Sequence, residues 1–309
     1  MLNKLIRILN FDNSVIAQKK LLSQYKTEII DLEDIALRAR YWINARTKRL
    51  IQERIHGLDR NCVSFIGSGD FHHISSILIN QFSEPLTLLV FDFHPDWDAA
   101  ALSLSCGSWV TDTLKNKNIL KCLLLGPSSN DISTWGIQSA NLSSLKDNRV
   151  EIYPYARKPS IVFLKRVPHN ISLRLEKGFL HNRIYWEELR GKNLPEFFLS
   201  LIQRLPTKQV YVSIDKDCLK NDSSLTNWEE GVFSLDELLS MLRIIRENLD
   251  IVGVDISGDY SKVWAKERIK AFFSRLDRPK GIKAKELDPS VVTATNEATN
   301  LKILETLLA

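Results

Sequence analysis

The feature that most constrains the fold is a series of short apolar runs that alternate with helical patterns along the chain. Eight of these runs have the length of a strand: Cys62–Ile66, Thr87–Phe93, Leu120–Leu125, Val150–Tyr153, Ile161–Leu164, Arg183–Trp186, Val210–Ile214 and Ile251–Ile256. Many are almost continuously apolar, which is typical of parallel strands covered on both faces. Strands that alternate with helices predict an α/β fold with a mostly parallel sheet.

Several segments between the runs have helical patterns. Ser234-Leu-Asp-Glu237 is a capping box, and apolar residues follow it at helical spacing. Thr295–Leu308 places three leucines on one face and predicts a last helix. Near the N-terminus, Leu32–Ile55 has the pattern of a long, charged, amphipathic helix. We therefore expect a partly helical N-terminal extension, 1–60, beside one α/β domain over 61–309.

Composition narrows the class of protein. Hydrophobic residues make up 44% of the 309 residues, which excludes a mainly disordered chain. The net charge of +5 is a mild excess, and the basic stretch Arg38–Arg54 has the pattern of a solvated helix face, so we do not expect a nucleic-acid partner. No apolar run approaches the length of a membrane span, and the N-terminus lacks the pattern of a signal peptide. We expect a cytoplasmic protein with no membrane partner.

Side chains that bind metals follow three of the expected strands. The segments are Gly67–His73, Asp92–Asp98 and Ser213–Asp217. Ligand sites in parallel α/β sheets gather beyond the carboxyl ends of the strands. Any one of these segments would be an ordinary capped turn, but three of them at strand ends predict a common site.

The spacing of the acidic residues indicates which side chains meet. Residues two apart on a strand point the same way, so Asp92, His94 and Asp96 would converge, as would Asp215 and Asp217. Four buried carboxylates would repel one another, and two divalent cations would balance them. Carboxylates together with imidazoles suit Mn²⁺, with Zn²⁺, Fe²⁺ and Ni²⁺ as alternatives. A water that bridges two such ions loses a proton near neutral pH and becomes a hydroxide nucleophile.

These motifs resemble those of the ureohydrolases, the superfamily of arginases and agmatinases. Asp92-Phe-His-Pro-Asp96 is similar to the D-A-H-x-D motif of that family, and Ser213-Ile-Asp-Lys-Asp217 is similar to its S-x-D-x-D motif. Gly67-Ser-Gly-Asp-Phe-His72 resembles its G-G-D-H motif with one extra residue, and Ser105-Cys-Gly107 stands where the family has S-H-G. The resemblance begins near the first expected strand and extends into the last helix.

The resemblance implies a three-layer, arginase-like α/β fold around an eight-stranded parallel sheet. It also implies a homo-oligomer with a binuclear manganese centre that hydrolyses a C–N bond. By motif position the six ligands would be Asp92 and Asp215 as bridges, His72 and Asp96 for one ion, and His94 and Asp217 for the other. Asp96 would also orient the bridging hydroxide. His73 is the alternative to His72, because Phe71 is an insertion in the motif.

Two departures from the family bear on the substrate. The family glutamate that holds a guanidinium group falls on Gly258, which carries no charge. A guanidinium in a dry site needs a carboxylate partner, so we do not expect arginase or agmatinase activity. The histidine of S-H-G is replaced by Cys106, which is either a catalytic nucleophile or acid, or a small residue of the pocket wall.

Four further residues are candidates for binding a small-molecule substrate: Asp98, Asp255, Asp259 and Trp228. Asp98 would favour a cationic substrate, with a solvated loop carboxylate as the alternative. Asp255 would hold the pocket floor or hydrogen-bond a turn, and Asp259 would replace the missing glutamate only if the strand has already ended. Lys216, inside its motif, is expected to point away from the metals towards solvent or a helix face.

The sequence therefore predicts a binuclear metal hydrolase that cleaves a C–N bond of an amidine, formimino, guanidino or amide substrate. The alternative is a non-catalytic scaffold or binding protein that retains the arginase fold. The metal content of the purified protein distinguishes the two.

Overall fold

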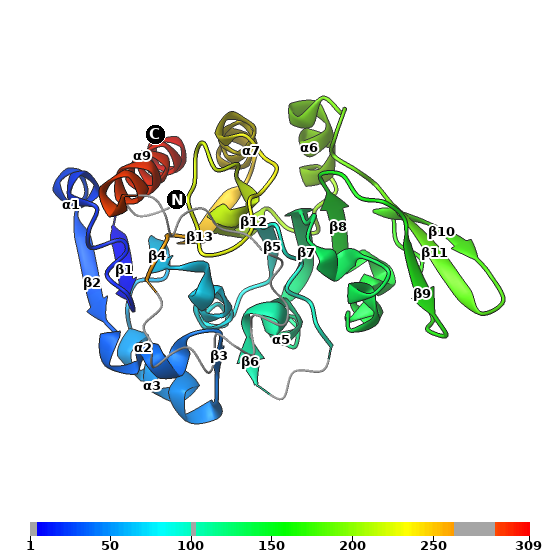
Figure 1. The fold of residues 1–309 in the computed structure, drawn as a ribbon, viewed down its shortest axis with the longest axis horizontal. Helices are drawn as coiled ribbons and strands as arrows, with labels where there is room; N and C mark the ends of the chain where they lie inside the picture. Colours follow the sequence, from blue (N-terminus) through cyan, green and yellow to red (C-terminus); the bar gives the residue numbers. More distant parts are fainter. Residues whose placement is uncertain (1–4, 100–102, 263–287) are drawn as a thin grey trace.

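A parallel eight-stranded sheet forms the centre of the molecule in the computed structural model, which describes residues 5–99, 103–262 and 288–309 (Figure 1). The strand order is β2-β1-β4-β13-β12-β5-β7-β8, and every pair in it is parallel. The strands are β1 (Ile6–Asn10), β2 (Thr27–Asp31), β4 (Val63–Gly67), β5 (Leu86–Phe91), β7 (Ile119–Gly126), β8 (Val150–Pro154), β12 (Gln209–Asp215) and β13 (Asp250–Ser257). The expected α/β fold with a parallel eight-stranded sheet is confirmed.

Helices cover both faces of this sheet, so the molecule has three layers (Figure 1). One face carries α1 (Lys19–Gln24), α6 (Leu194–Ile202), α7 (Leu235–Asn248) and α9 (Pro289–Leu308). The other carries α2 (Glu33–Ala39), α3 (Ala45–Ile55), α4 (Ser75–Ile79) and α5 (Trp109–Thr113). On β5, Leu88 and Val90 join one core while Leu89 and Phe91 join the other. Burial on both faces explains why the strand sequences are almost continuously apolar.

The ends of the helices follow local sequence signals. Helix α7 begins after Ser234, whose hydroxyl accepts from the Glu237 backbone N–H while the Glu237 carboxylate accepts from the Ser234 N–H at 2.8 Å. This is the expected capping box. Helix α9 begins at Pro289, earlier than expected, because the Asp288 side chain caps it by accepting from the Ser290 N–H at 2.8 Å. Short 3₁₀ helices fill several turns: η1 (Gly69–Ile74), η2 (Cys106–Ser108), η3 (Asn130–Ile132), η4 (Gly136–Gln138), η5 (Leu142–Asn148) and η6 (Lys216–Cys218).

Residues 1–60 are partly helical as expected, with α1, α2 and α3, but they are part of the α/β domain and not an extension beside it. Strands β1 and β2 come from this segment, and β1 pairs directly with β4 inside the main sheet. The expected long helix is divided into α2 and α3 by the two-residue strand β3 (Trp42–Ile43), which pairs with β6 (Leu104–Ser105). Tertiary contacts override the helical pattern there, since buried Arg40 forms an ion pair with Asp70 at 2.5 Å and Tyr41 has a φ of 69°. Arg40 is therefore not on a solvated helix face.

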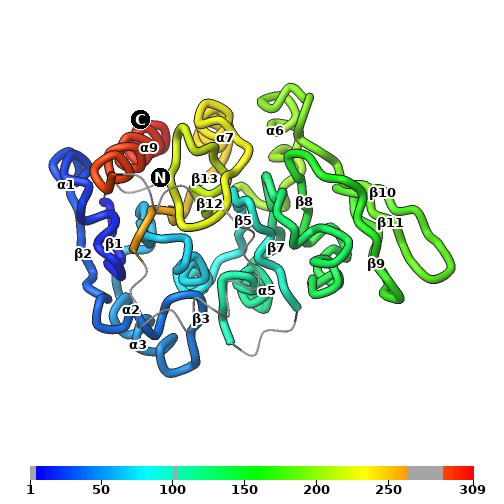
Figure 2. The backbone as a smooth tube through the Cα atoms, in the orientation of Figure 1, coloured from blue at the N-terminus to red at the C-terminus, as the bar shows by residue number. Residues whose placement is uncertain are grey.

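Two of the expected strands lie outside the main sheet, in a separate antiparallel sheet with the order β10-β11-β9. Its strands are β9 (Ser160–Phe163), β10 (Leu173–Lys177) and β11 (His181–Trp186). We refer to residues 158–186 as the arm. Figures 1 and 2 show its strands on the side of β8, at one end of the molecule. Among the described residues, no helix is long and apolar enough to cross a bilayer.

A buried polar cluster ties the two ends of the chain to the sheet. The Asp259 carboxylate, just beyond β13, accepts from Lys216 Nζ at 2.9 Å and from Gln18 Nε2 at 2.7 Å. Asn300 of α9 donates to the Gln18 side chain at 2.9 Å. Lys216 and Asp259 are almost completely buried, so Lys216 does not reach solvent. Asp259 is committed to this ion pair, and its assignment as a substrate-binding residue is wrong.

Removing one partner of this ion pair tests its structural role. Asp259→Ala should lower the free energy of unfolding by about 3–5 kcal/mol, because the Lys216 ammonium would stay buried without a carboxylate. Urea denaturation followed by circular dichroism measures this change. Asp250→Ala, an exposed position at the other end of β13, should shift it by less than about 0.5 kcal/mol. Equal effects of the two substitutions would contradict the assignment.

Candidate metal centre

The expected metal ligands lie at one edge of the sheet, where the carboxyl ends of β4, β5 and β12 meet. His72 lies on η1 after β4, Asp92 follows β5 directly, and Asp215 is the last residue of β12. In the sheet β12 lies between β5 and β13, and β13 pairs with β4. The order of the strands therefore brings together three segments that are far apart in the sequence.

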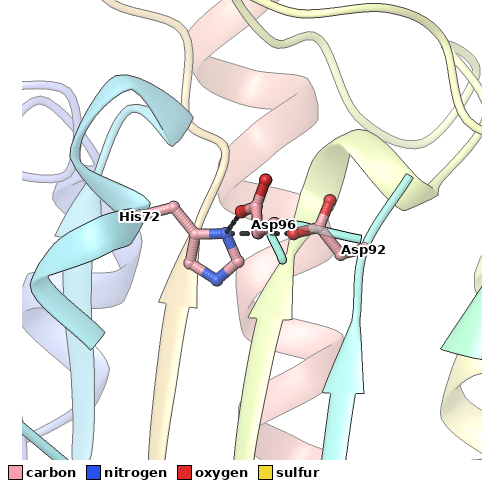
Figure 3. Close-up of side chains that lie close together, drawn as sticks. All are labelled: His72, Asp92 and Asp96. Carbon is pink, nitrogen blue, oxygen red and sulfur yellow. Dashed lines mark ion pairs between the residues drawn. The ribbon is translucent and has the colours of Figure 1, made fainter. Parts of the chain in front are cut away.

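His72 is at the centre of the first ligand group (Figure 3). Its Nδ1 lies 3.1 Å from Asp92 Oδ2, 3.5 Å from Asp96 Oδ2 and 3.4 Å from Asp215 Oδ2. All four side chains are buried. His72, Asp92 and Asp96 offer ligand atoms within 4.8 Å of one another, a separation that one ion can span.

His94 is at the centre of the second group, together with Asp92 and Asp217. Its Nδ1 lies 2.9 Å from Asp217 Oδ2 and 3.7 Å from Asp92 Oδ1. Asp92 thus belongs to both groups, with one oxygen facing each histidine. This is the arrangement that a carboxylate bridge between two ions requires.

The electrostatics of these residues fit divalent cations. Burial and the charge of Asp92 raise the pKa of Asp96 to about 7. Burial and the charges of Asp215 and Asp92 raise the pKa of Asp217 well above its ordinary value. Protons and metal ions compete for such carboxylates, and four carboxylates with two imidazole nitrogens form a donor set suited to Mn²⁺ and its neighbours.

The backbone that brings the ligands together differs from the expected extended strand. Strand β5 ends at Phe91, and Asp96 has a left-handed φ of 48°. Asp217 lies on η6, where its N–H donates to Asp215 Oδ1 at 3.1 Å. The Phe93 N–H donates to Asp217 Oδ1 at 3.1 Å and links the two turns. Convergence therefore arises from tight turns and not from the alternation of side chains along a strand.

A hydrogen-bonded relay orients His72. Its Nε2 lies 2.9 Å from Ser213 Oγ, and the Ser213 hydroxyl donates to Asp255 Oδ1 at 2.7 Å. Because the hydroxyl has one hydrogen, Ser213 accepts from the His72 Nε2–H, which leaves the Nδ1 lone pair facing the carboxylates. Asp255 is fully buried beneath His72, so its assignment to substrate binding is replaced by a positioning role.

His73 and Cys106 form the wall beside the metal ligands. His73 Nδ1 lies 3.3 Å from Cys106 Sγ, so His73 faces away from the carboxylates and His72 is the histidine of the cluster. Cys106 lines the cavity in front of the ligands. Burial and the charges of Asp96 and Asp70 raise the pKa of its thiol well above the ordinary value, which favours the neutral thiol over the thiolate.

Glu229 is a residue of the centre that sequence reasoning missed. Its Oε2 lies 3.0 Å from His94 Nε2, on the side of the ring opposite the metal ligands. Trp228 packs edge-on against the same ring, with centroids 5.3 Å apart. The only sequence signal is a polar loop after the Ser213–Asp217 motif. Such a loop does not indicate which of its residues will contact a histidine far away in the sequence.

A cavity of about 220 Å³ opens onto the ligands. Asp98, Trp228 and Cys106 line it as expected, and Asp131 of η3 lines it as well. Asp98 Oδ1 accepts from Ser139 at 2.7 Å, and Asp131 Oδ2 accepts from Ser129 at 2.6 Å. Among the described residues, no lysine or arginine lines this cavity. Its walls therefore favour a cationic or neutral ligand.

Gly258 is a glycine for a structural reason. Its φ is 90°, and a Cβ at this position would lie 2.5 Å from Asp215 Oδ1 and 2.6 Å from the Lys216 backbone nitrogen. Residues with a side chain rarely adopt this backbone conformation. A carboxylate cannot enter the cavity from position 258 without displacing Asp215.

The contact between Glu229 and His94 has a measurable consequence. Glu229→Ala should weaken Mn²⁺ binding by about 10- to 100-fold, because the His94 ring loses the acceptor that fixes its orientation. Isothermal titration calorimetry with Mn²⁺ measures the affinity. Glu230→Ala is the matched control, since Glu230 is exposed and bonds only within its loop at 3.1 Å. Identical affinities of the two variants would show that Glu229 does not position the ligand.

Comparison of the sequence with known proteins finds one relative and no family model. No protein-family model matches the chain. An uncharacterized protein of Thermotoga maritima is 28% identical over 242 residues, which are 75% of this chain and 76% of that protein.

Solved structures are similar over nearly the whole chain. An Entamoeba histolytica arginase in complex with L-ornithine has a TM-score of 0.55 at 12% identity, covering 100% of both chains. A Trypanosoma cruzi formiminoglutamase variant with Mn²⁺ has a TM-score of 0.53 at 10% identity, covering 98% of this chain and 93% of that one. The chain therefore has the fold of the ureohydrolase superfamily, in a divergent form.

Proposed function

We propose that this chain is a metal-dependent hydrolase that cleaves a C–N bond of an amidine, formimino, guanidino or amide substrate. The observation that carries the proposal is the pair of buried ligand groups that share Asp92 and open onto a cavity. Two of the similar structures are named as an arginase and a formiminoglutamase, and these names denote enzymes that act on C–N bonds. This similarity supports the same class of reaction. Mn²⁺ is the expected ion, since carboxylates dominate the donor set.

The residues divide into two sets around the shared carboxylate. His72 and Asp96 would hold one ion, His94 and Asp217 the other, and Asp92 and Asp215 would contact both. When bound, divalent ions lower the pKa of water and polarise the trigonal carbon of the substrate. To that chemistry the protein supplies buried ligand side chains held in fixed orientations.

Asp96 is suited to orient the attacking water and hold its proton. Its Oδ2 accepts from Trp109 Nε1 at 2.7 Å, and the buried indole fixes the carboxylate. With a cation bound beside it the carboxylate would stay ionised and could accept a hydrogen bond from the attacking water. Cys106 contributes to the wall beside it as a neutral thiol.

The cavity selects the substrate by charge. Asp98 and Asp131 lie outside both ligand groups and present carboxylates to the cavity, so they suit an amine or another cation at the far end of the substrate. The absence of a carboxylate at Gly258 argues against arginine and agmatine. We therefore propose a small amidine or formimino compound with a cationic tail.

Metal content tests the proposal directly. Protein purified without chelator and supplied with Mn²⁺ should hold about two ions per chain by elemental analysis. Asp92→Ala should lose both ions, because Asp92 belongs to both groups, whereas Asp217→Ala should lose mainly one. Asp222→Ala, at an exposed loop position, should keep two. A parent protein that takes up no metal would contradict the proposal of a metal-dependent hydrolase and favour a non-catalytic scaffold.

Substrate charge is tested at Asp131. With amidine substrates that end in a protonated amine, Asp131→Asn should raise KM about tenfold with little change in kcat, because a binding charge is lost and the metal ligands are untouched. A neutral-tailed amidine of the same length should show no change. Steady-state release of ammonia measures both, with Asp222→Asn as the control variant. An equal KM increase for both tails would rule out a charge contact at Asp131.

A further inference from the structure

The arm, residues 158–186, carries the positive charge of the whole protein. It contains six of the 42 lysines and arginines and one of the 37 acidic residues, so the rest of the chain has 36 of each and is neutral. That single acidic residue, Glu176, faces Arg183 at 3.7 Å and accepts from Tyr185. The remaining basic residues of the arm thus present their charge to the surroundings.

The end of the arm is apolar. Leu164, Phe179 and Leu180, which we call the tip, expose 84%, 101% and 60% of their surface. The Leu164 N–H donates to the Leu180 carbonyl at 3.3 Å, so the three side chains come from two adjoining turns. Patches of this kind on a protein surface mark interaction sites.

Backbone strain holds one of these side chains outwards. Leu164 has a left-handed φ of 51°, which is unfavourable for a branched side chain, and this exposed residue makes no compensating contact in a core. Next to it, the ring centroids of Phe163 and Trp135 lie 6.2 Å apart, and Trp135 is 81% exposed. The apolar surface therefore continues from the tip towards an amphipathic indole.

A cavity lies beside the tip, between β10 and the connection from β9. Its volume is about 680 Å³, and its basic lining residues are Arg166, His169, Arg174 and Lys177. Among the described parts of the chain, no acidic residue lines it and no carboxylate forms an ion pair with Arg166 or Lys177. Such a cavity fits the phosphate of an anionic ligand.

We propose that the arm docks on an anionic phospholipid surface, with the tip among the acyl chains and the basic cavity on the lipid phosphates. Cations beside exposed apolar side chains are the combination that binds such surfaces. A single-stranded nucleic acid would pair with the basic residues and stack on Phe179 and Trp135, but it would leave Leu164 and Leu180 exposed to water. Two arms facing each other would repel, which disfavours a dimer formed through its arms. The proposal is independent of the proposed hydrolase activity. It replaces the expectation of no membrane partner, which rested on the length of the apolar runs and not on surface charge.

Vesicle cosedimentation of the full-length protein tests this docking. The protein should bind vesicles of phosphatidylcholine that contain phosphatidylglycerol, should not bind vesicles of phosphatidylcholine alone, and should dissociate as salt is raised. Phe179→Ser/Leu180→Ser should weaken binding at least tenfold, and so should Arg166→Gln/Lys177→Gln. Leu37→Ser and Lys146→Gln alter an exposed leucine and an exposed lysine on the body of the protein and should bind as the parent does.

Four results would overturn the proposal. One is a parent that binds neutral and anionic vesicles equally, or binds neither, and another is a set of tip variants that bind like the parent. The third is binding of a single-stranded oligonucleotide that is lost in Arg166→Gln/Lys177→Gln, with no binding to vesicles. The fourth is a parent oligomer that dissociates in Phe179→Ser/Leu180→Ser by light scattering, again without vesicle binding, which would assign the tip to a second copy. Circular dichroism of each variant separates loss of binding from loss of the fold.

Discussion

The concentration of negative charge at one edge of the parallel sheet governs the rest of the structure. Asp92, Asp96, Asp215 and Asp217 are all buried there, and unpaired buried carboxylates are strongly unfavourable. Histidine contacts and backbone N–H donors offset part of this cost, and divalent cations would offset the rest. A chain keeps such an arrangement only where the surrounding layers hold every ligand in place.

Those layers supply the restraint through contacts behind the ligands. Ser213 and Asp255 fix His72, Glu229 fixes His94, and Trp109 fixes Asp96. These partners lie on β12, β13, α5 and the loop after η6, so the site forms only when these segments have packed against one another. The same dependence explains why Lys216, inside a ligand motif, is part of a buried ion pair that reaches both ends of the chain.

Much of the fold could be predicted, because strands covered on both faces have near-continuous apolar sequences. Six of the eight expected runs became strands of the central sheet. Strands β1 and β2 were missed, since β1 contains Arg7, whose charge is buried against Glu28 and interrupts the apolar run. The prediction of one helix over Leu32–Ile55 is wrong because Arg40 pairs with Asp70, which lies 30 positions further along the chain. A contact over that distance gives no signal in the local sequence.

The sequence by itself determined the chemistry of this protein: which side chains can bind metal, that they follow parallel strands, and that position 258 has no carboxylate to offer. These are properties of residue type and short spacing, which each segment carries alone. Only the tertiary structure decided between His72 and His73 and moved Asp255 and Asp259 out of the cavity. It also brought Glu229 to His94 and Asp131 to the cavity. Those assignments depend on turns, left-handed residues and contacts between distant segments, whose geometry is fixed only when the layers pack.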